Sequence, residues 1–183
     1  TAPQPLDDDG WRHLAAHAGA VASLAGEYGL TVALHPHIGT LIETDAQVQR
    51  ALEVTDVGWC LDTGHLMIGG TDPAAFARRH GERVTHVHLK DVDAAIAAAL
   101  MAGQMSLVEA TRAGLFVPLG SGAAPVAQTL QALNEHGYDG WLVLEQDTAI
   151  TADEPAVTSA PMLAARQSIA FLNSAHRTEE INR

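Results

Sequence analysis

Three observations predict a parallel α/β fold for this chain. Short apolar segments alternate with stretches of helical periodicity, the order that places parallel strands between covering helices. The apolar segments are nearly continuous, as in strands buried on both faces. The 183 residues, 47% hydrophobic and 17% charged, suit one globular domain with a sizeable core. We therefore expect a single α/β domain over residues 1–183.

The expected elements alternate along the chain. Strands are expected at 30–35, 57–62, 84–89 and 141–145, with a shorter extended piece at 115–120. Helices are expected at 11–28, 45–54, 72–80, 93–112, 125–136 and 160–175. Gly29 is a suitable stop for the first helix, Thr44 an N-cap for the second, and Pro73 a first-turn residue of the third.

Charge and composition exclude several classes of protein. Ten Lys and Arg against 22 Asp and Glu give a formal net charge of −12, so the chain lacks the basic surface of a nucleic-acid binder and an anionic membrane would repel it. No apolar run reaches transmembrane length, and no signal-peptide pattern is seen. The single cysteine, Cys60, is compatible with a reducing compartment and is expected to be a buried small hydrophobe. We expect a cytoplasmic protein without nucleic-acid or membrane partners.

Polar residues, most of them able to bind metal ions, follow each main strand at its C-terminal end. In chain order they are His35, His37 and Glu43, then Asp62 and His65, then His86, His88, Lys90 and Asp91, and finally Glu145 and Asp147. The C-terminal ends of parallel strands meet at one edge, where ligands and catalytic groups gather. Two carboxylates with one or two imidazoles suit Mn²⁺, Co²⁺, Mg²⁺ or Fe²⁺ better than a closed structural zinc site.

Some of these residues also have plain structural interpretations. Asp62 can cap the turn that follows it, and Lys90 with its acidic neighbour can be a solvated pair at a loop start. His86 and His88 share a strand face, and of the two His86 is expected as a satisfied core residue. Glu145 closes an apolar run, where an unpaired carboxylate is costly, so we expect it to bind an ion or a cationic partner.

Five motifs, taken in order, carry a resemblance to a known family. HPHIGTLIET, LDTGHL, HVHLKDV, GLFVPLGSG and GYDGWLVLEQD resemble the inosose dehydratase branch of the xylose isomerase-like sugar isomerase/epimerase superfamily, over roughly residues 10–175. The resemblance implies a (β/α)₈ TIM barrel. Such a barrel takes about 250 residues, so the chain is expected to supply its C-terminal part, about strands 4 to 8. In the turn PLGSGAAPV, Ser121 and Ala124 stand where the family often has an acidic residue.

The resemblance also implies roles for the residues at the strand ends. The implied metal ligands are Glu43, Asp62, His88 and Glu145, with His35 as the alternative to Glu43. The implied substrate-binding residues are His35, His37, His65 and Lys90. The implied catalytic residues are His37, His65, Lys90 and Glu145. The implied metal is Mn²⁺ or Co²⁺, with Mg²⁺, Fe²⁺ and Zn²⁺ as alternatives.

The activity implied by the resemblance is a metal-dependent dehydratase that removes water from an inosose (2-keto-myo-inositol) in inositol catabolism. A ketose 3-epimerase or aldose–ketose isomerase would use the same metal-bound enediolate and is the first alternative; an inactive metal-binding fragment is the second. The superfamily also contains endonucleases that act at abasic DNA, but the acidic charge and 4% aromatic content argue against that activity. The expected partners are a polyol or sugar and, because an opened sheet exposes its edges, a second copy of the chain.

Overall fold

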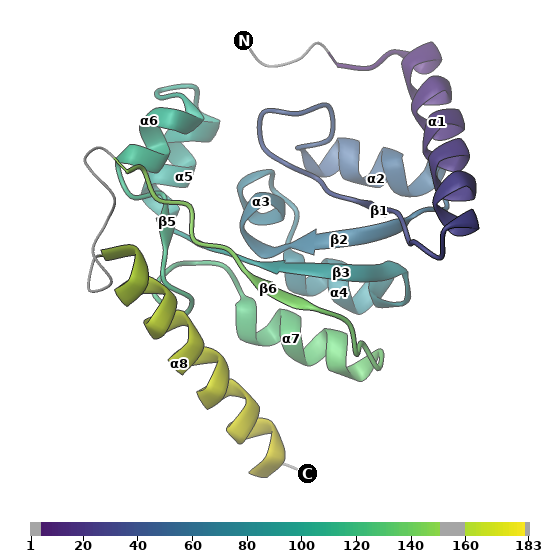
Figure 1. Cartoon of the computed structure of the whole chain (residues 1–183). Helices are drawn as coiled ribbons and strands as arrows, with labels where there is room; N and C mark the ends of the chain where they lie inside the picture. Colours follow the sequence, from purple (N-terminus) through teal and green to yellow (C-terminus); the bar gives the residue numbers. More distant parts are fainter. Residues whose placement is uncertain (1–4, 151–159, 182–183) are drawn as a thin grey trace.

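The computed structural model describes residues 5–150 and 160–181, with side chains to residue 175 in the last helix. Its centre is a parallel sheet with the strand order β1-β2-β3-β6 (Figure 1). The strands are β1 (Ala33–Leu34), β2 (Gly58–Asp62), β3 (Val84–Leu89) and β6 (Leu142–Leu144). The parallel α/β sheet predicted from the sequence is confirmed.

The helices of the described residues lie between and beside these strands (Figure 1). They are α1 (Asp8–Glu27), α2 (Asp45–Val54), α3 (Thr63–Ile68), α4 (Pro73–His80), α5 (Ala94–Met101), α6 (Leu107–Arg112), α7 (Val126–Glu135) and α8 (Ala160–Ile181), with a 3₁₀ turn η1 (Gly81–Arg83). Helices α4 and α7 pack against each other. Trp59 of β2 meets Phe76 of α4 with ring centroids 5.4 Å apart.

Local signals in the sequence fix several of these boundaries. Thr44 accepts a hydrogen bond from the Gln47 N–H while the Gln47 side chain accepts one from the Thr44 N–H, a capping box at the start of α2. Pro73 begins α4 behind the N-cap Asp72. Gly29, with φ +69°, follows α1 in the left-handed region that favours glycine. These three predictions are confirmed.

Alternate residues of β2 and β3 divide between the two faces of the sheet. Trp59 and Leu61, and Val87 and Leu89 on the neighbouring strand, are fully buried in the hydrophobic core. Because successive side chains point to opposite faces, Asp62 lies on the other face, and it pairs in register with His88. One face of the sheet therefore packs in the core and the other carries the polar groups.

The predicted helix 93–112 is wrong as a single element. It is divided into α5 and α6, because Gly103 adopts φ +69° and Ser106 with Glu109 forms a capping box that starts a new helix. The short helix α3, whose N-cap is Asp62, was not predicted. The last helix runs past the predicted end at residue 175 to Ile181, since no glycine or proline follows to stop it.

One predicted strand is shorter than expected, and the predicted extended piece lies outside the parallel sheet. The segment 30–35 forms only the two-residue strand β1, which has one neighbour at the sheet edge. The segment 115–120 contributes only β5 (Phe116–Val117), which pairs antiparallel with β4 (Asp91–Val92) outside the parallel sheet, and β3 pairs directly with β6. The chain turns through a glycine-rich segment after β5, and this turn is held by hydrogen bonds that are described below.

Large apolar side chains are exposed beside both edges of the sheet. Tyr28 and Leu30, next to β1, are 75% and 66% exposed, and Trp141, next to β6, is 79% exposed. An apolar groove of about 530 Å³ runs between α1 and β1 and is lined in part by Leu14, Val21 and Leu34. Within the described ranges, no helix is long and apolar enough to cross a membrane.

Candidate metal centre

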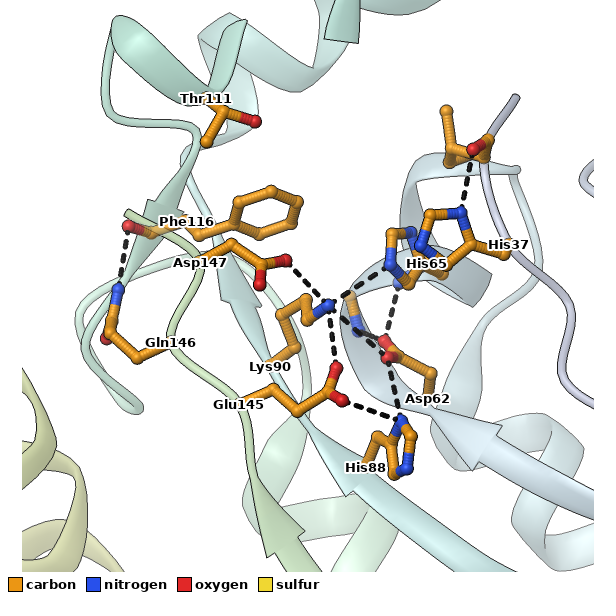
Figure 2. Close-up of polar contacts among 12 residues, drawn as sticks. His37, Asp62, His65, His88, Lys90, Thr111, Phe116, Glu145, Gln146 and Asp147 are labelled. Atoms are coloured by element: carbon orange, nitrogen blue, oxygen red, sulfur yellow. Dashed lines mark hydrogen bonds and ion pairs between the residues drawn. The ribbon is translucent and has the colours of Figure 1, made fainter. Parts of the chain in front are cut away.

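Three strand ends bring Asp62, His88 and Glu145 together (Figure 2). Asp62 ends β2 opposite His88 of β3, and Glu145 follows β6, where its N–H donates to the Leu89 carbonyl at 3.1 Å. His88 Nδ1 lies 3.2 Å from Glu145 Oε1 and 3.8 Å from Asp62 Oδ2. One potential ligand atom from each of the three residues lies within 4.8 Å of the others.

The two oxygens of Asp62 have different environments. Oδ1 accepts the N–H groups of Gly64 and His65, both at 2.8 Å, and caps α3. Oδ2 is buried and has no hydrogen-bond partner among the described residues. The capping interpretation and the ligand interpretation of Asp62 are therefore compatible, because each uses a separate oxygen.

Unpartnered polar atoms mark the centre of this cluster. Like Asp62 Oδ2, the buried atoms His35 Nε2 and His88 Nδ1 have no hydrogen-bond partner in the described part of the chain. His35 Nε2 lies 3.4 Å from Asp62 Oδ2, and the His35 and His88 rings are 4.8 Å apart. Buried polar atoms without partners are costly. Oxygen and nitrogen atoms converging in this way fit a divalent cation.

The ionisation of Asp62 and His88 suits metal binding. Burial raises the pKa of Asp62, but the contacts with His35, His65 and Lys90 outweigh it and lower this pKa to about 2. Burial lowers the pKa of His88 against the opposing effect of Glu145. The cluster therefore presents a carboxylate and a neutral imidazole, the forms that bind metal ions.

The fourth expected ligand, Glu43, is not brought into this cluster. Its Oε2 accepts the N–H of Gly39 at 2.6 Å within its own loop, and it lines a separate cavity of about 680 Å³ beside α5 and α6. The loop turns at Gly39, with φ +83°, which gives Glu43 this local partner. The alternative ligand, His35, is the residue that the structure places beside Asp62.

A second group with ligand-bearing atoms includes the one cysteine. Cys60, together with His35 and His88, forms the other set of potential ligands found in the described residues. Cys60 is buried, as predicted, and is 3% exposed. This burial, with smaller contributions from Asp62 and Glu145, raises the pKa of Cys60 to about 12. Since the thiolate is the ligand form, the set containing the two carboxylates is the better metal site.

Lys90 lies at the centre of a buried ion-pair network (Figure 2). Its Nζ is 2.8 Å from Glu145 Oε2, 2.9 Å from Asp147 Oδ2 and 3.7 Å from Asp62 Oδ2. Burial lowers the pKa of Lys90, but these carboxylates outweigh it and the pKa is raised. Thr63 fixes the backbone, since its Oγ1 donates to the Lys90 carbonyl and accepts from the Lys90 N–H. The interpretation of Lys90 as a solvated residue is wrong.

The remaining histidines surround this network. Burial lowers the pKa of His65 to about 3, and its Nε2 accepts from Lys90 Nζ at 3.1 Å because an ammonium group only donates. The His37 ring lies 3.6 Å from the His65 ring, and His37 Nδ1 donates to the Ile38 carbonyl. His86, expected in the core, is only half-buried and packs edge-on to His88.

Asp91 has a structural role that the sequence did not indicate. Its carboxylate is 1% exposed and accepts N–H groups from Val92, Gly120, Gly122 and Ala124 at 2.9–3.0 Å. It thus supplies a buried carboxylate to the glycine turn that lacks the acidic residue often found in the family. A signal that could have indicated this role is the glycine-rich turn without an acidic side chain of its own.

Phe116 is a second residue that the sequence did not single out. It lies on β5, 7% exposed, with its ring centroid 5.0 Å from Lys90 Nζ, a distance at which a cation is attracted to an aromatic face. Figure 2 shows this ring beside Asp147 and Lys90. A lone Phe in a short extended segment carries no pattern that distinguishes this position from an ordinary core residue.

Comparison with known proteins places the chain in a family. The chain matches the family described as xylose isomerase-like TIM barrel over residues 2–175, and it belongs to that family. It is 39% identical to the rhizopine catabolism protein MocC of Rhizobium meliloti over 69% of this chain and 40% of that protein. It is 36% identical to the inosose dehydratase of Geobacillus thermodenitrificans over 78% of this chain and 50% of that protein.

Solved structures agree on the fold. An L-ribulose 3-epimerase structure matches with a TM-score of 0.68 at 22% identity, over 98% of this chain and 59% of that one. The IolI protein, whose structure contains a bound zinc atom, matches with a TM-score of 0.65 at 17% identity, over 95% of this chain and 59% of that one. The chain spans about half the length of the curated relatives it matches. The resemblance to inosose dehydratases and the TIM-barrel fold type are confirmed.

Proposed function

We propose that the chain carries the metal-binding part of a dehydratase that removes water from an inosose in inositol catabolism. The observation that carries the proposal is the convergence of His35 Nε2, Asp62 Oδ2 and His88 Nδ1, all without hydrogen-bond partners in the described residues, beside Glu145. Several inosose dehydratases, 32–37% identical to this chain, supply the substrate class. The substrate is accordingly a cyclic polyol ketone.

In this proposal Asp62, His88 and Glu145 hold a divalent cation, Mn²⁺ or Co²⁺, with His35 as the fourth ligand in place of Glu43. When bound, such a cation polarises the ketone and acidifies the neighbouring carbon-bound proton. A ligand set that mixes imidazoles and carboxylates suits Mn²⁺ and Co²⁺, while Mg²⁺, Fe²⁺ and Zn²⁺ are the alternatives. The matched IolI structure contains a bound zinc atom, which supports a divalent metal in a protein of this fold.

Separate residues around the metal site are assigned to removing the carbon-bound proton and to protonating the departing hydroxide. His65 is a poor base, because its pKa is low. We therefore assign the carbon-bound proton to the Glu145 carboxylate. Lys90 Nζ, which carries protons and lies 2.8 Å from Glu145, donates to the departing hydroxide. His37, His65 and His35 are the histidines that we assign to binding substrate hydroxyls.

A product assay tests this function. The 183-residue chain, loaded with Mn²⁺ or Co²⁺, is incubated with inosose and in parallel with ketohexoses. We expect loss of water from inosose, seen as the absorbance of a diketone, and no turnover after removal of the metal with EDTA. Epimerised ketohexose without dehydration would favour the 3-epimerase alternative. Metal binding without turnover of either substrate would favour the inactive fragment.

Location and assembly are further parts of the proposal. The single buried cysteine suits the reducing cytoplasm. The apolar side chains exposed beside β1 and β6 suit pairing with a second copy of the chain. Light scattering tests this pairing: twice the chain mass supports it, and the monomer mass at all concentrations contradicts it.

A further inference from the structure

The ammonium group of Lys90 is shared between carboxylates of the proposed metal site and one carboxylate outside it, and it also donates to His65. Glu145 and Asp62, at 2.8 and 3.7 Å from Nζ, belong to the proposed ligand set. Asp147, at 2.9 Å, belongs to neither group of potential metal ligands in the described residues. Its side chain is 48% exposed, whereas that of Lys90 is 3% exposed.

Lys90 is held close to the site by its surroundings. Its backbone is fixed by Thr63, and its side chain passes so close to Gly64 that a Cβ there would lie 2.8 Å from Lys90 Cγ. The Phe116 ring lies on another side, 5.0 Å from Nζ. The stem of Lys90 is therefore confined, and only its ammonium tip is free to change partner.

A cation bound by Asp62 and Glu145 would compete with this ammonium for the same oxygens. The two positive charges would also repel each other at this short range. Asp147 offers the ammonium a carboxylate that the metal does not use. We propose that Asp147 is a positioning residue, which draws the Lys90 ammonium away from the metal ligands and so permits cation binding; this inference rests on the proposed metal site.

Calorimetric titration of the 183-residue chain with Mn²⁺ tests the proposal. Asp147→Asn is expected to weaken Mn²⁺ binding about tenfold, because the only carboxylates left to Lys90 among its described partners are then those of the proposed metal ligands; coupled neighbours commonly interact at this level. The control is Asp56→Asn, which makes the same charge change at an exposed position before β2, at the opposite end of that strand from Asp62. Asp56→Asn is expected to change the affinity less than about twofold.

Variants of Lys90 test whether Asp147 acts by positioning the Lys90 ammonium or by the direct effect of its own charge on the metal. The Lys90→Met variant is expected to bind Mn²⁺ more tightly than the unchanged chain. Adding Asp147→Asn to this variant is expected to weaken Mn²⁺ binding by no more than about twofold. Lys90→Gln, a polar replacement, gives the same comparison if the Met variant fails to fold by circular dichroism. An equal loss from Asp147→Asn with and without Lys90, or no loss in either, would overturn the inference. Absence of Mn²⁺ binding by the unchanged chain would instead overturn the proposed metal site, and this inference with it.

Discussion

Replacing Asp62 by Asn is expected to weaken Co²⁺ binding by at least about 100-fold, since loss of groups that merely orient ligands already costs 10–100-fold. Asn keeps an oxygen that can accept from Gly64 and His65, so the cap of α3 is preserved. What is lost is the negative charge of the buried Oδ2, which has no hydrogen-bond partner among the described residues. The affinity is measured by calorimetry, and binding is confirmed by the visible absorption of bound Co²⁺.

The matched control for this prediction is Glu43→Gln. It removes the same charge from the residue that the sequence favoured as a ligand, but one whose carboxylate is bonded to Gly39 in its own loop. We expect it to retain Co²⁺ affinity within a few-fold, as for surface charge changes. A loss as large as that of Asp62→Asn would show that Glu43, and not His35, completes the site.

Replacing Asp91 by Asn is expected to lower the free energy of unfolding by about 3 kcal/mol. Each hydrogen bond to a charged group stabilises the fold by about 1–3 kcal/mol, and each unsatisfied buried donor costs about the same. One carboxylate oxygen accepts from Gly120 and Gly122, and an amide NH₂ at that place would face two donors. The Oδ1 bonds to Val92 and Ala124 can remain. Urea unfolding followed by circular dichroism measures the change.

Asp93→Asn is the control for the Asp91 variant. Asp93 caps α5 by accepting from the N–H groups of Ala95 and Ile96, and Asn is an equally good N-cap. We expect a change within about 0.5 kcal/mol, the range of ordinary surface substitutions. Equal stability of the two variants would contradict a special role of Asp91 in holding the glycine turn.

The sequence predicted those parts of the fold that have strong local signals. Thr44 with Gln47 and Pro73 behind Asp72 are local caps, and the boundaries of their helices were accurate. The segment 115–120 was predicted as a short extended piece and contains the strand β5, whereas its partner β4 and its antiparallel pairing are tertiary features. Short apolar segments do not specify their neighbour.

The candidate site could be predicted as far as strand order determines it. Asp62 pairs in register with His88, and Glu145 directly follows β6, the other neighbour of β3, so their meeting follows from a parallel sheet. The choice between His35 and Glu43 depended on how the loop turns at Gly39, which the sequence does not specify. Phe116 and Asp147 reach Lys90 only through tertiary packing, and no spacing rule points to them.

The most direct test of the metal site is an NMR spectrum of the chain with one equivalent of Co²⁺. Paramagnetic Co²⁺ shifts the ring protons of ligand imidazoles far outside the normal range, and the chain has 10 histidines from which to choose. We predict strongly shifted signals from His35 and His88, assigned by their loss in single Gln variants. Signals from His13 and His17 on α1, exposed on the surface, should stay in the normal range. Shifted signals from His13 and His17, or from no histidine at all, would contradict a metal centre at the ends of β1, β2, β3 and β6.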